Sequence, residues 1–294
     1  MSGSVKKSRK NLKSQLSQFV GFLFLRIAVY SVLFVLLYFF YDIGSKGYKL
    51  ITWEFLTQAP RRGMTEGGIF PAIIGTFLVT LITALLAIPL GMAAAIYLNE
   101  YARGGRLTRL IRLSIRNLAG VPSIVYGLFG VILFVNMLKL GTSVLSAGLT
   151  LGLLTLPWTI TASEEALKSV PDSYREGALA LGATKWQMIR TNVLPYAIPG
   201  MLTGGVLGLA RAAGETAPIM FTGAAFFLPY LPRSLKDQFM ALPYHLYIMA
   251  TQHHSIDKGR AIAYGTALVL IIFVVVFNLA AIIIRARLRR KWRH

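Results

Sequence analysis

The chain of 294 residues contains no cysteine and few acidic residues. Without cysteine it has no disulfide, no thiolate nucleophile and no thiolate ligand for a metal. It also lacks the G-x-x-x-x-G-K-[ST] phosphate loop, the H-E-x-x-H zinc motif and the G-x-S-x-G nucleophile motif. We therefore expect no enzymatic site in this chain: no catalytic residue, no bound metal and no cofactor.

The charge that is present is strongly one-sided. Lys and Arg number 31 against 11 Asp and Glu, which gives a formal net charge of +20, yet 55% of the residues are hydrophobic. A polytopic membrane protein with basic cytoplasmic segments combines these two properties naturally. The cations lie in tails and in loops between apolar runs, which argues against a nucleic-acid partner.

Six apolar runs are long enough to cross a bilayer, which takes about 20 residues as a helix. The first run is too long for a signal peptide, and no small-x-small cleavage site closes it, so we expect it to be retained. The sequence thus predicts an all-α polytopic membrane protein with six transmembrane helices. The predicted spans cover residues 19–41, 71–98, 118–135, 144–162, 193–218 and 261–284.

The distribution of Lys and Arg predicts the orientation of these spans. If both termini are cytoplasmic, the inner segments carry 20 of these residues and the outer segments carry 9. The positive-inside rule therefore favours cytoplasmic termini. The predicted organisation is a basic tail (1–18), a first helix with its outer loop (19–67), a transmembrane domain (68–284) and a second basic tail (285–294).

A polar segment, residues 169–192, separates the fourth and fifth predicted spans. Ser169 with Asp172, and Thr184 with Gln187, have the spacing of helix-capping pairs. Gly182 lies between the two predicted short helices, where a left-handed C-cap favours glycine. We call residues 169–192 the elbow and expect a helix–turn–helix in the cytoplasm. Apolar stripes are predicted on both helices: Tyr174, Ala178 and Leu181 on the first, and Trp186, Ile189 and Val193 on the second.

The elbow resembles the EAA loop of bacterial ABC-importer permeases. That pattern is E-A-A, three residues, G, nine residues and I-x-L-P; here Gly177 replaces an Ala and Asn192 replaces the Ile. The resemblance implies that the elbow docks into a groove of a separate ATPase subunit. The implied coupling residues are Glu176, Gly177, Ala178, Gly182, Leu194 and Pro195.

Three further stretches resemble the phosphate-importer branch of these permeases, of the PstA type: residues 120–130, 210–223 and 241–250. The resemblance implies a MetI-like permease fold in the bacterial cytoplasmic (inner) membrane. It implies a heterodimer with a PstC-like sister permease, a PstB-like ATPase dimer and a PstS-like phosphate-binding protein. It also implies that the cargo is inorganic phosphate carried into the cytoplasm.

The fifth predicted span contains two ionisable residues, Arg211 and Glu215, at a spacing that puts them on one helix face. Ionisable groups inside a span usually face a polar cavity or a partner, and a guanidinium suits phosphate oxygens. We expect Arg211, Glu215 and Thr216 to lie on the substrate pathway. The alternative is that Arg211 and Glu215 pair only to hold the helices together.

Two other functions stay open at this stage. The same Arg211 would serve another oxyanion, such as sulfate, molybdate or phosphonate. A membrane signalling scaffold could bind a partner through the elbow without moving solute, but it would have no need of ionisable residues inside a span.

Overall fold

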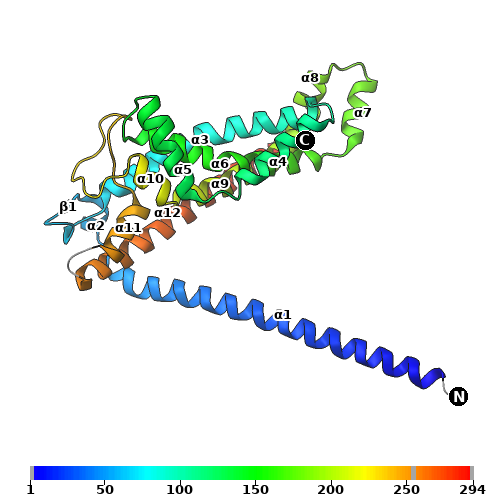
Figure 1. Cartoon of the computed structure of the whole chain (residues 1–294), viewed down its shortest axis with the longest axis horizontal. Helices are drawn as coiled ribbons and strands as arrows, with labels where there is room; N and C mark the ends of the chain where they lie inside the picture. The colour runs from blue at the N-terminus through cyan, green and yellow to red at the C-terminus, as the bar shows by residue number, and fades with distance from the viewer. Residues whose placement is uncertain (1–2, 253–255, 292–294) are drawn as a thin grey trace.

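The computed structural model describes residues 3–252 and 256–291, and most of these are helical (Figure 1). The helices are α1 (Gly3–Gly47), α2 (Trp53–Thr57), α3 (Phe70–Ile96), α4 (Arg106–Leu118), α5 (Ser123–Gly130), α6 (Val144–Lys168), α7 (Asp172–Ala180), α8 (Lys185–Met188), α9 (Leu194–Ala213), α10 (Ala217–Thr222), α11 (Leu242–Thr251) and α12 (Ile256–Lys291). A 3₁₀ turn, η1 (Tyr48–Leu50), and three π-helical segments, η2 (Tyr97–Tyr101), η3 (Val131–Met137) and η4 (Ile189–Val193), extend some of these helices.

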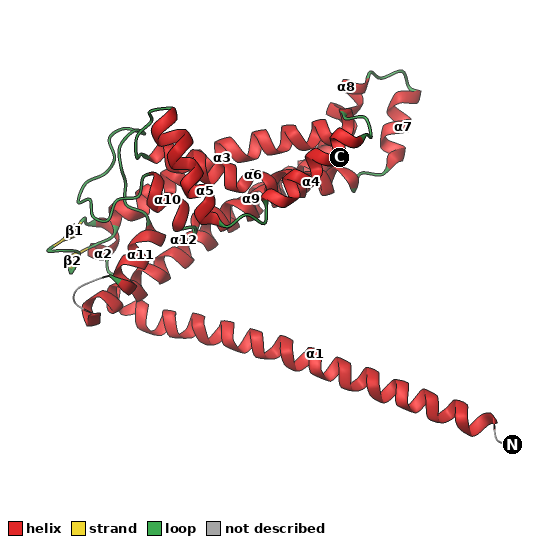
Figure 2. Cartoon of the chain, in the orientation of Figure 1, coloured by secondary structure: helices red, strands yellow, loops and turns green. Residues whose placement is uncertain are grey.

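Loops gather at one end of the long helical bundle, and the elbow projects at the other (Figure 2). The loop end carries α2, α11 and a small antiparallel sheet of β1 (Pro60–Arg61) and β2 (Glu66–Gly67). Its apolar cluster includes Phe55, Ile69, Met240 and Leu242. The elbow end carries α7 and α8, whose apolar side chains join the ends of α3 and α6.

The centre of the bundle is formed by α6, which packs directly against α3 and α9. Small residues let these backbones approach closely, as is common between membrane helices. A Cβ on Gly204 of α9 would clash with the Cβ of Ala162 on α6, and one on Gly152 would clash with Leu86 of α3. The hydroxyl of Thr83 donates a hydrogen bond across to the Gly148 carbonyl, 3.2 Å away.

Five of the described helices are long and apolar enough to cross a membrane, and the bent pair α4 with α5–η3 brings the number to six. The third predicted span, residues 118–135, corresponds to the second arm of this pair, Ser123–Met137, except that the helix begins after Pro122. The two arms meet at 102°, and the helical part Ser123–Met137 is only about 22 Å long at 1.5 Å per residue. Pro122 disfavours helical geometry at the residue before it, which accounts for the break.

The fifth predicted span, residues 193–218, was wrong as a single helix. Helix α9 ends at Ala213, and α10 begins at Ala217. Gly214 is the C-cap of α9, and Pro218 is the second residue of α10. Glycine favours helix ends and proline favours first turns, so the two residues define the interruption.

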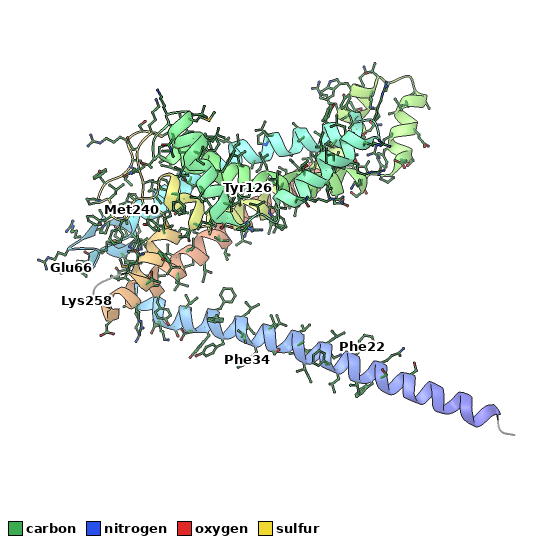
Figure 3. All side chains as sticks on the ribbon, viewed as in Figure 1. Phe22, Phe34, Glu66, Tyr126, Met240 and Lys258 are labelled. Atoms are coloured by element: carbon green, nitrogen blue, oxygen red, sulfur yellow. The ribbon has the colours of Figure 1, made fainter. Side chains whose placement is uncertain are left out.

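Helix α1 meets the bundle at the C-terminal end of α1. Towards its N-terminus, α1 runs progressively farther from the other helices (Figure 1). The apolar stretch within Ser17–Leu50 has no buried residue, and Phe22 and Phe34 lie on a helix that stands apart from the others (Figure 3). Near its end, the Lys46 ammonium bonds to Asp42 at 2.6 Å and lies 4.8 Å from the centre of the Tyr264 ring of α12. Lys46 therefore helps to fasten α1 to α12.

The close contact between α6 and α9 can be tested with Gly204→Val. The added side chain collides with Ala162, so we expect a loss of about 1–3 kcal/mol in stability and a lower melting temperature of the purified protein. Gly21→Val is the matched control, because a Cβ on Gly21 of α1 meets nothing within 4 Å. Equal melting temperatures for the two variants would contradict the packing described above.

Candidate functional site

The elbow has the helix–turn–helix form that its sequence predicts. Helix α7 ends at Ala180, and Gly182 follows with φ +82°, in the left-handed region that favours glycine. The predicted capping box at Thr184 is confirmed. Its hydroxyl accepts a hydrogen bond from the Gln187 amide at 3.3 Å, and its own amide donates to Oε1 of Gln187 at 2.8 Å.

The predicted cap at Ser169 was wrong. Helix α7 begins at Asp172, directly after Pro171, and Pro171 has no side-chain group to cap it. The Ser169 hydroxyl instead donates to the Ala166 carbonyl at 2.7 Å, and Ser169 closes α6. The reason is that helical geometry is disfavoured at Val170, the residue before Pro171, so α7 begins only after Pro171 and Ser169 lies outside its first turn.

The apolar residues of the elbow divide between two surfaces. Ala178, Ile189 and Val193 are buried against Leu98 and Leu167 at the elbow end of the bundle. The other three stripe residues are exposed: Leu181 at 90%, Trp186 at 55% and Tyr174 at 46%. The elbow therefore keeps part of its apolar stripe on the surface of this chain.

The coupling residues implied by the resemblance occupy three parts of the elbow. Glu176 and Gly177 are exposed on α7, Ala178 is buried beside them, and Gly182 forms the turn. A Cβ on Gly177 would meet no atom within 4 Å, so the departure from alanine there is sterically neutral. The half-buried residues Leu194 and Pro195 begin α9.

Asn192, the other departure from the family pattern, has a structural role. Its Nδ2 donates to the Tyr174 carbonyl at 3.3 Å, and this bond connects η4 to α7. The rings of Tyr174 and Tyr196 lie 5.5 Å apart and connect α7 to α9 as well. The Asn192 side-chain amide therefore helps to hold α7 and η4 together.

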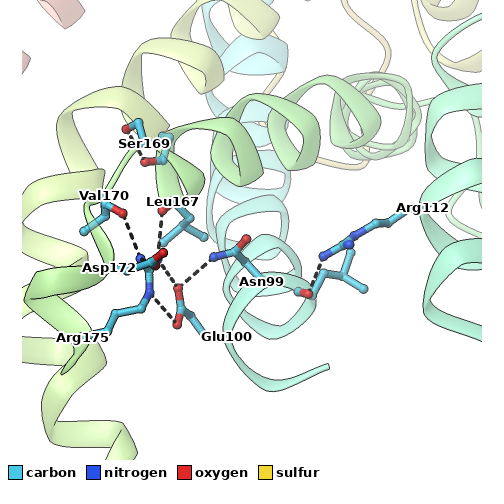
Figure 4. A network of polar contacts seen from close by, with 10 residues as sticks. Asn99, Glu100, Arg112, Leu167, Ser169, Val170, Asp172 and Arg175 are labelled. Atoms are coloured by element: carbon cyan, nitrogen blue, oxygen red, sulfur yellow. Dashed lines mark hydrogen bonds and ion pairs between the residues drawn. The ribbon is translucent and has the colours of Figure 1, made fainter. Parts of the chain in front are cut away.

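Sequence reasoning missed Arg175, the most highly bonded side chain of the elbow (Figure 4). Its guanidinium donates to Glu100 Oε1 at 2.9 Å, to the Leu167 carbonyl at 3.0 Å and to the Val170 carbonyl at 2.9 Å. It also pairs with Asp172 at 3.2 Å. The hydrogen bond with Glu100 raises the pKa of Arg175 above its ordinary value. Glu100 and Arg175 are 75 positions apart, so no local pattern links them.

A second ion pair, Arg112 with Glu164, lies at the same end of the bundle, and Figure 4 shows Arg112 of this pair. Arg112 of α4 donates through Nε to Glu164 of α6 at 3.1 Å and through Nη2 to the Leu98 carbonyl at 2.7 Å. Glu164 is buried, and this pair fixes α4 against the ends of α6 and α3. Among the described residues, the hydrogen bonds and the ion pair of Arg112 and Glu164 do not reach α7 or α8.

Arg211 and Glu215 come together where α9 is interrupted. Arg211 is in the last turn of α9, and Glu215 lies in the gap before α10, with Nε and Oε1 3.4 Å apart. The prediction that both lie on one continuous helix face was wrong, because Gly214 ends the helix between them. Thr216 caps α10 without a side-chain hydrogen bond and is half-buried.

Trp158, which sequence reasoning did not select, completes this group. The Arg211 guanidinium carbon lies 4.9 Å from the centre of the Trp158 ring on α6, a cation–π distance. Trp158 lies about 21 Å along α6 from its first residue, Val144, and about 15 Å from its last residue, Lys168. The charge pair therefore lies in the middle of the bundle, where Arg211 is nonetheless 48% exposed.

Irregular backbone at membrane depth occurs where it is buried in protein or lines a water-filled cavity. Gly214 is exposed and Glu215 and Thr216 are half-buried, so the gap between α9 and α10 is open on one side. This side must face a partner chain or an aqueous path. Among the described residues, no group of three or more His, Asp or Glu could hold a metal ion.

Comparison with known proteins identifies the family. The model of the family described as "Binding-protein-dependent transport system inner membrane component" matches residues 87–294. The chain belongs to this family. The predicted multi-pass, all-helical architecture and importer-permease fold are thereby confirmed.

Relatives of this permease include proteins named for phosphate transport. The phosphate transport system permease protein PstA 1 of Mycobacterium tuberculosis is 40% identical over 223 residues, 74% of this chain and 71% of the relative. A probable ABC transporter permease, YqgI of Bacillus subtilis, is 34% identical over 247 residues, 80% of this chain and 83% of the relative.

Two solved structures support the permease fold. A bacterial alginate ABC transporter superposes with a TM-score of 0.64 at 15% identity, covering 89% of this chain and 94% of that one. The MetNI methionine ABC transporter in an inward-facing conformation gives 0.61 at 18% identity, covering 74% and 94%. At these identities the likeness is one of fold alone.

The capping box of the elbow can be tested with Thr184→Ala. Loss of the cap leaves the Gln187 amide without its acceptor, so we expect α8 to lose about 1 kcal/mol of local stability. Hydrogen exchange of the amides in residues 185–188 should then speed up. Thr191→Ala is the control, because that hydroxyl donates to the Gln187 carbonyl and to Asn192 Oδ1 and accepts no hydrogen bond from the Gln187 amide. Equal exchange in both variants would contradict the cap.

Proposed function

We propose that this chain is the permease subunit of an ATP-driven importer that moves inorganic phosphate into the cytoplasm. The observation that carries the proposal is Arg211, a half-exposed guanidinium in the middle of the bundle, placed at an open interruption of α9. A guanidinium offers several donors to the oxygens of a phosphate. The family and the phosphate permeases among the relatives support the same cargo.

We propose Arg211, Glu215 and Thr216 as pathway residues, with Glu215 as the counter-charge of Arg211 when no anion is present. The Nε–Oε1 separation of 3.4 Å and the exposure of Arg211 make this a weak pair that an anion can replace. An unpaired guanidinium in a low-dielectric site would hold phosphate too tightly for release. A nearby carboxylate lowers that affinity and speeds passage.

The proposed assembly places four kinds of chain together. A PstC-like sister permease covers the open side of Arg211, a PstB-like ATPase dimer receives the elbow, and a PstS-like binding protein delivers phosphate from outside. The chain itself is a transport subunit, with hydrolysis on the ATPase chains. It lies in the bacterial inner membrane with both termini cytoplasmic, so the elbow faces the ATPase.

The docking surface proposed for the ATPase is the exposed part of the elbow, with Leu181 and Trp186 as its apolar contacts. ATP-driven closure of the partner dimer would move the elbow and rock the two permease halves as rigid bodies. Glu176, Gly177, Ala178, Gly182, Leu194 and Pro195 are the proposed coupling residues.

Arg211→Gln tests the pathway. The charge-assisted bonds to phosphate are lost, and since such bonds contribute about 1.5–3 kcal/mol, phosphate uptake should fall about 10-fold to 100-fold. Uptake is measured in proteoliposomes that contain the assembled complex and its binding protein. Arg211→Lys should be intermediate, because an ammonium keeps the charge without the planar fork.

The control for this series is Arg62→Gln, which removes an exposed guanidinium next to the small sheet. Unchanged uptake in the Arg211→Gln complex would remove Arg211 from the pathway. Running the same assay with sulfate, molybdate and a phosphonate decides the cargo: preferential uptake of one of them would overturn the assignment of phosphate.

The elbow is tested with Gly182→Val. A β-branched residue at φ +82° is strained, so the turn should change shape and ATP hydrolysis should continue with reduced phosphate uptake. The measured quantity is ATP hydrolysed per phosphate transported. Gly141→Val is the control, because Gly141 has the same left-handed backbone, φ +68°, with no atom near the added Cβ, and it lies outside the elbow. Normal coupling in the Gly182→Val complex would refute a transmission role for this turn.

A further inference from the structure

The two legs of the elbow are joined to the bundle in different ways. The second leg is continuous: α8, η4 and α9 form one uninterrupted helical stretch from Lys185 to Ala213. The first leg, α7, follows α6 after the three residues 169–171, and Pro171 has an extended backbone with ψ 140°. The backbone alone therefore leaves α7 free to pivot at this link.

Side chains remove that freedom. Arg175 of α7 bonds to the Leu167 carbonyl in the last turn of α6, to the Val170 carbonyl in the link itself, and to Glu100 of η2 at the end of α3 (Figure 4). The side chains are well covered, at 17% exposed for Arg175 and 5% for Glu100. One guanidinium thus joins three separate elements at the elbow end.

The helix that receives this contact leads to the charge pair. α3 packs along α9, where Ile88 lies against Gly205, and Gly91 of α3 lies against Thr159 of α6. Thr159 directly follows Trp158, the residue under Arg211. A displacement of α7 would pass through Glu100 into α3 and so reach the level of Arg211, separately from the route through α8.

We propose that Arg175 and Glu100 are positioning residues for coupling: they make α7 a rigid extension of α3 and α6. Movement applied to the elbow then turns both legs together, instead of pivoting α7 at Pro171. The proposal deepens the proposed function and rests on it in one respect, that the elbow receives movement from an ATPase. The neighbouring Arg112–Glu164 pair joins α4 to α6, and Arg112 also bonds to the Leu98 carbonyl of η2. Neither side chain bonds to α7, so we expect no such role for this pair.

The test compares the two ion pairs in the assembled complex with its ATPase and binding protein. Arg175→Gln and Glu100→Gln should raise the number of ATP molecules hydrolysed per phosphate transported about tenfold. A tenfold loss of coupling lies within the usual range for two coupled sites. Arg112→Gln, which also leaves a buried glutamate unpaired, should leave this ratio at the wild-type value. If both pairs changed the ratio equally, or neither did, the proposal would be overturned.

A second experiment covers the case in which the single variants fail to assemble. Because the chain has no cysteine, a Glu100→Cys, Arg175→Cys double variant carries the only two thiols of this subunit. A short, reducible bifunctional thiol reagent should restore coupling by replacing the ionic contact with a covalent one, and reduction should abolish it again. Coupling that is indifferent to cross-linking would refute the proposal. Absence of phosphate uptake in the wild-type complex would refute the proposed function instead.

Discussion

The close approach of α6 to α3 and α9 is the constraint on which the rest of the structure depends. Glycines 148 and 152 of α6 lie against Ile82 and Leu86 of α3, and Gly204 of α9 lies against Ala162. In a bilayer, lipid chains are as apolar as leucine, so helices associate through such close contact and not through burial from water. A larger residue at any of these points would shift α6 and with it Trp158, Glu164 and Leu167.

Two kinds of charge pair result from this arrangement. At the elbow end, Arg175–Glu100 and Arg112–Glu164 combine a buried carboxylate with backbone acceptors that fix the guanidinium. Such pairs contribute little net stability but specify one arrangement of the elements they join. In the middle of the bundle, Arg211–Glu215 is longer and more exposed. The two pairs at the elbow end suit a fixed contact between helices, and the Arg211–Glu215 pair suits a group that exchanges one ionic partner for another.

Local signals in the sequence were enough for the membrane spans as apolar runs and for the form of the elbow. Gly182 and the Thr184–Gln187 pair each act within one turn, so their spacing determines the outcome. The break at Gly214 also had a local signal, but the apolar run on both sides of it was read as one continuous helix. Hydrophobicity reports that a segment prefers lipid, and it does not report whether the helix is interrupted there.

Features that depend on distant residues could not be predicted in this way. Glu100 meets Arg175, and Trp158 meets Arg211, only after α3, α6 and α9 have packed. The divergence of α1 is a further case. Its apolar sequence predicts a span, but only the structure reveals that it contacts its own bundle near Lys46 and Gly47 and not along its length.

The interruption between α9 and α10 also bears on water. In a continuous helix, the backbone amides and carbonyls form hydrogen bonds with one another, whereas at this gap some of them need other partners. The Thr216 side chain does not supply one, because it does not cap α10. Water held at the open side of residues 214–216 would meet it. Such water raises the local dielectric constant and lowers the electrostatic energy of an ion at this depth. On the pathway proposed above, the break in the helix would then hydrate the anion in the middle of the bundle.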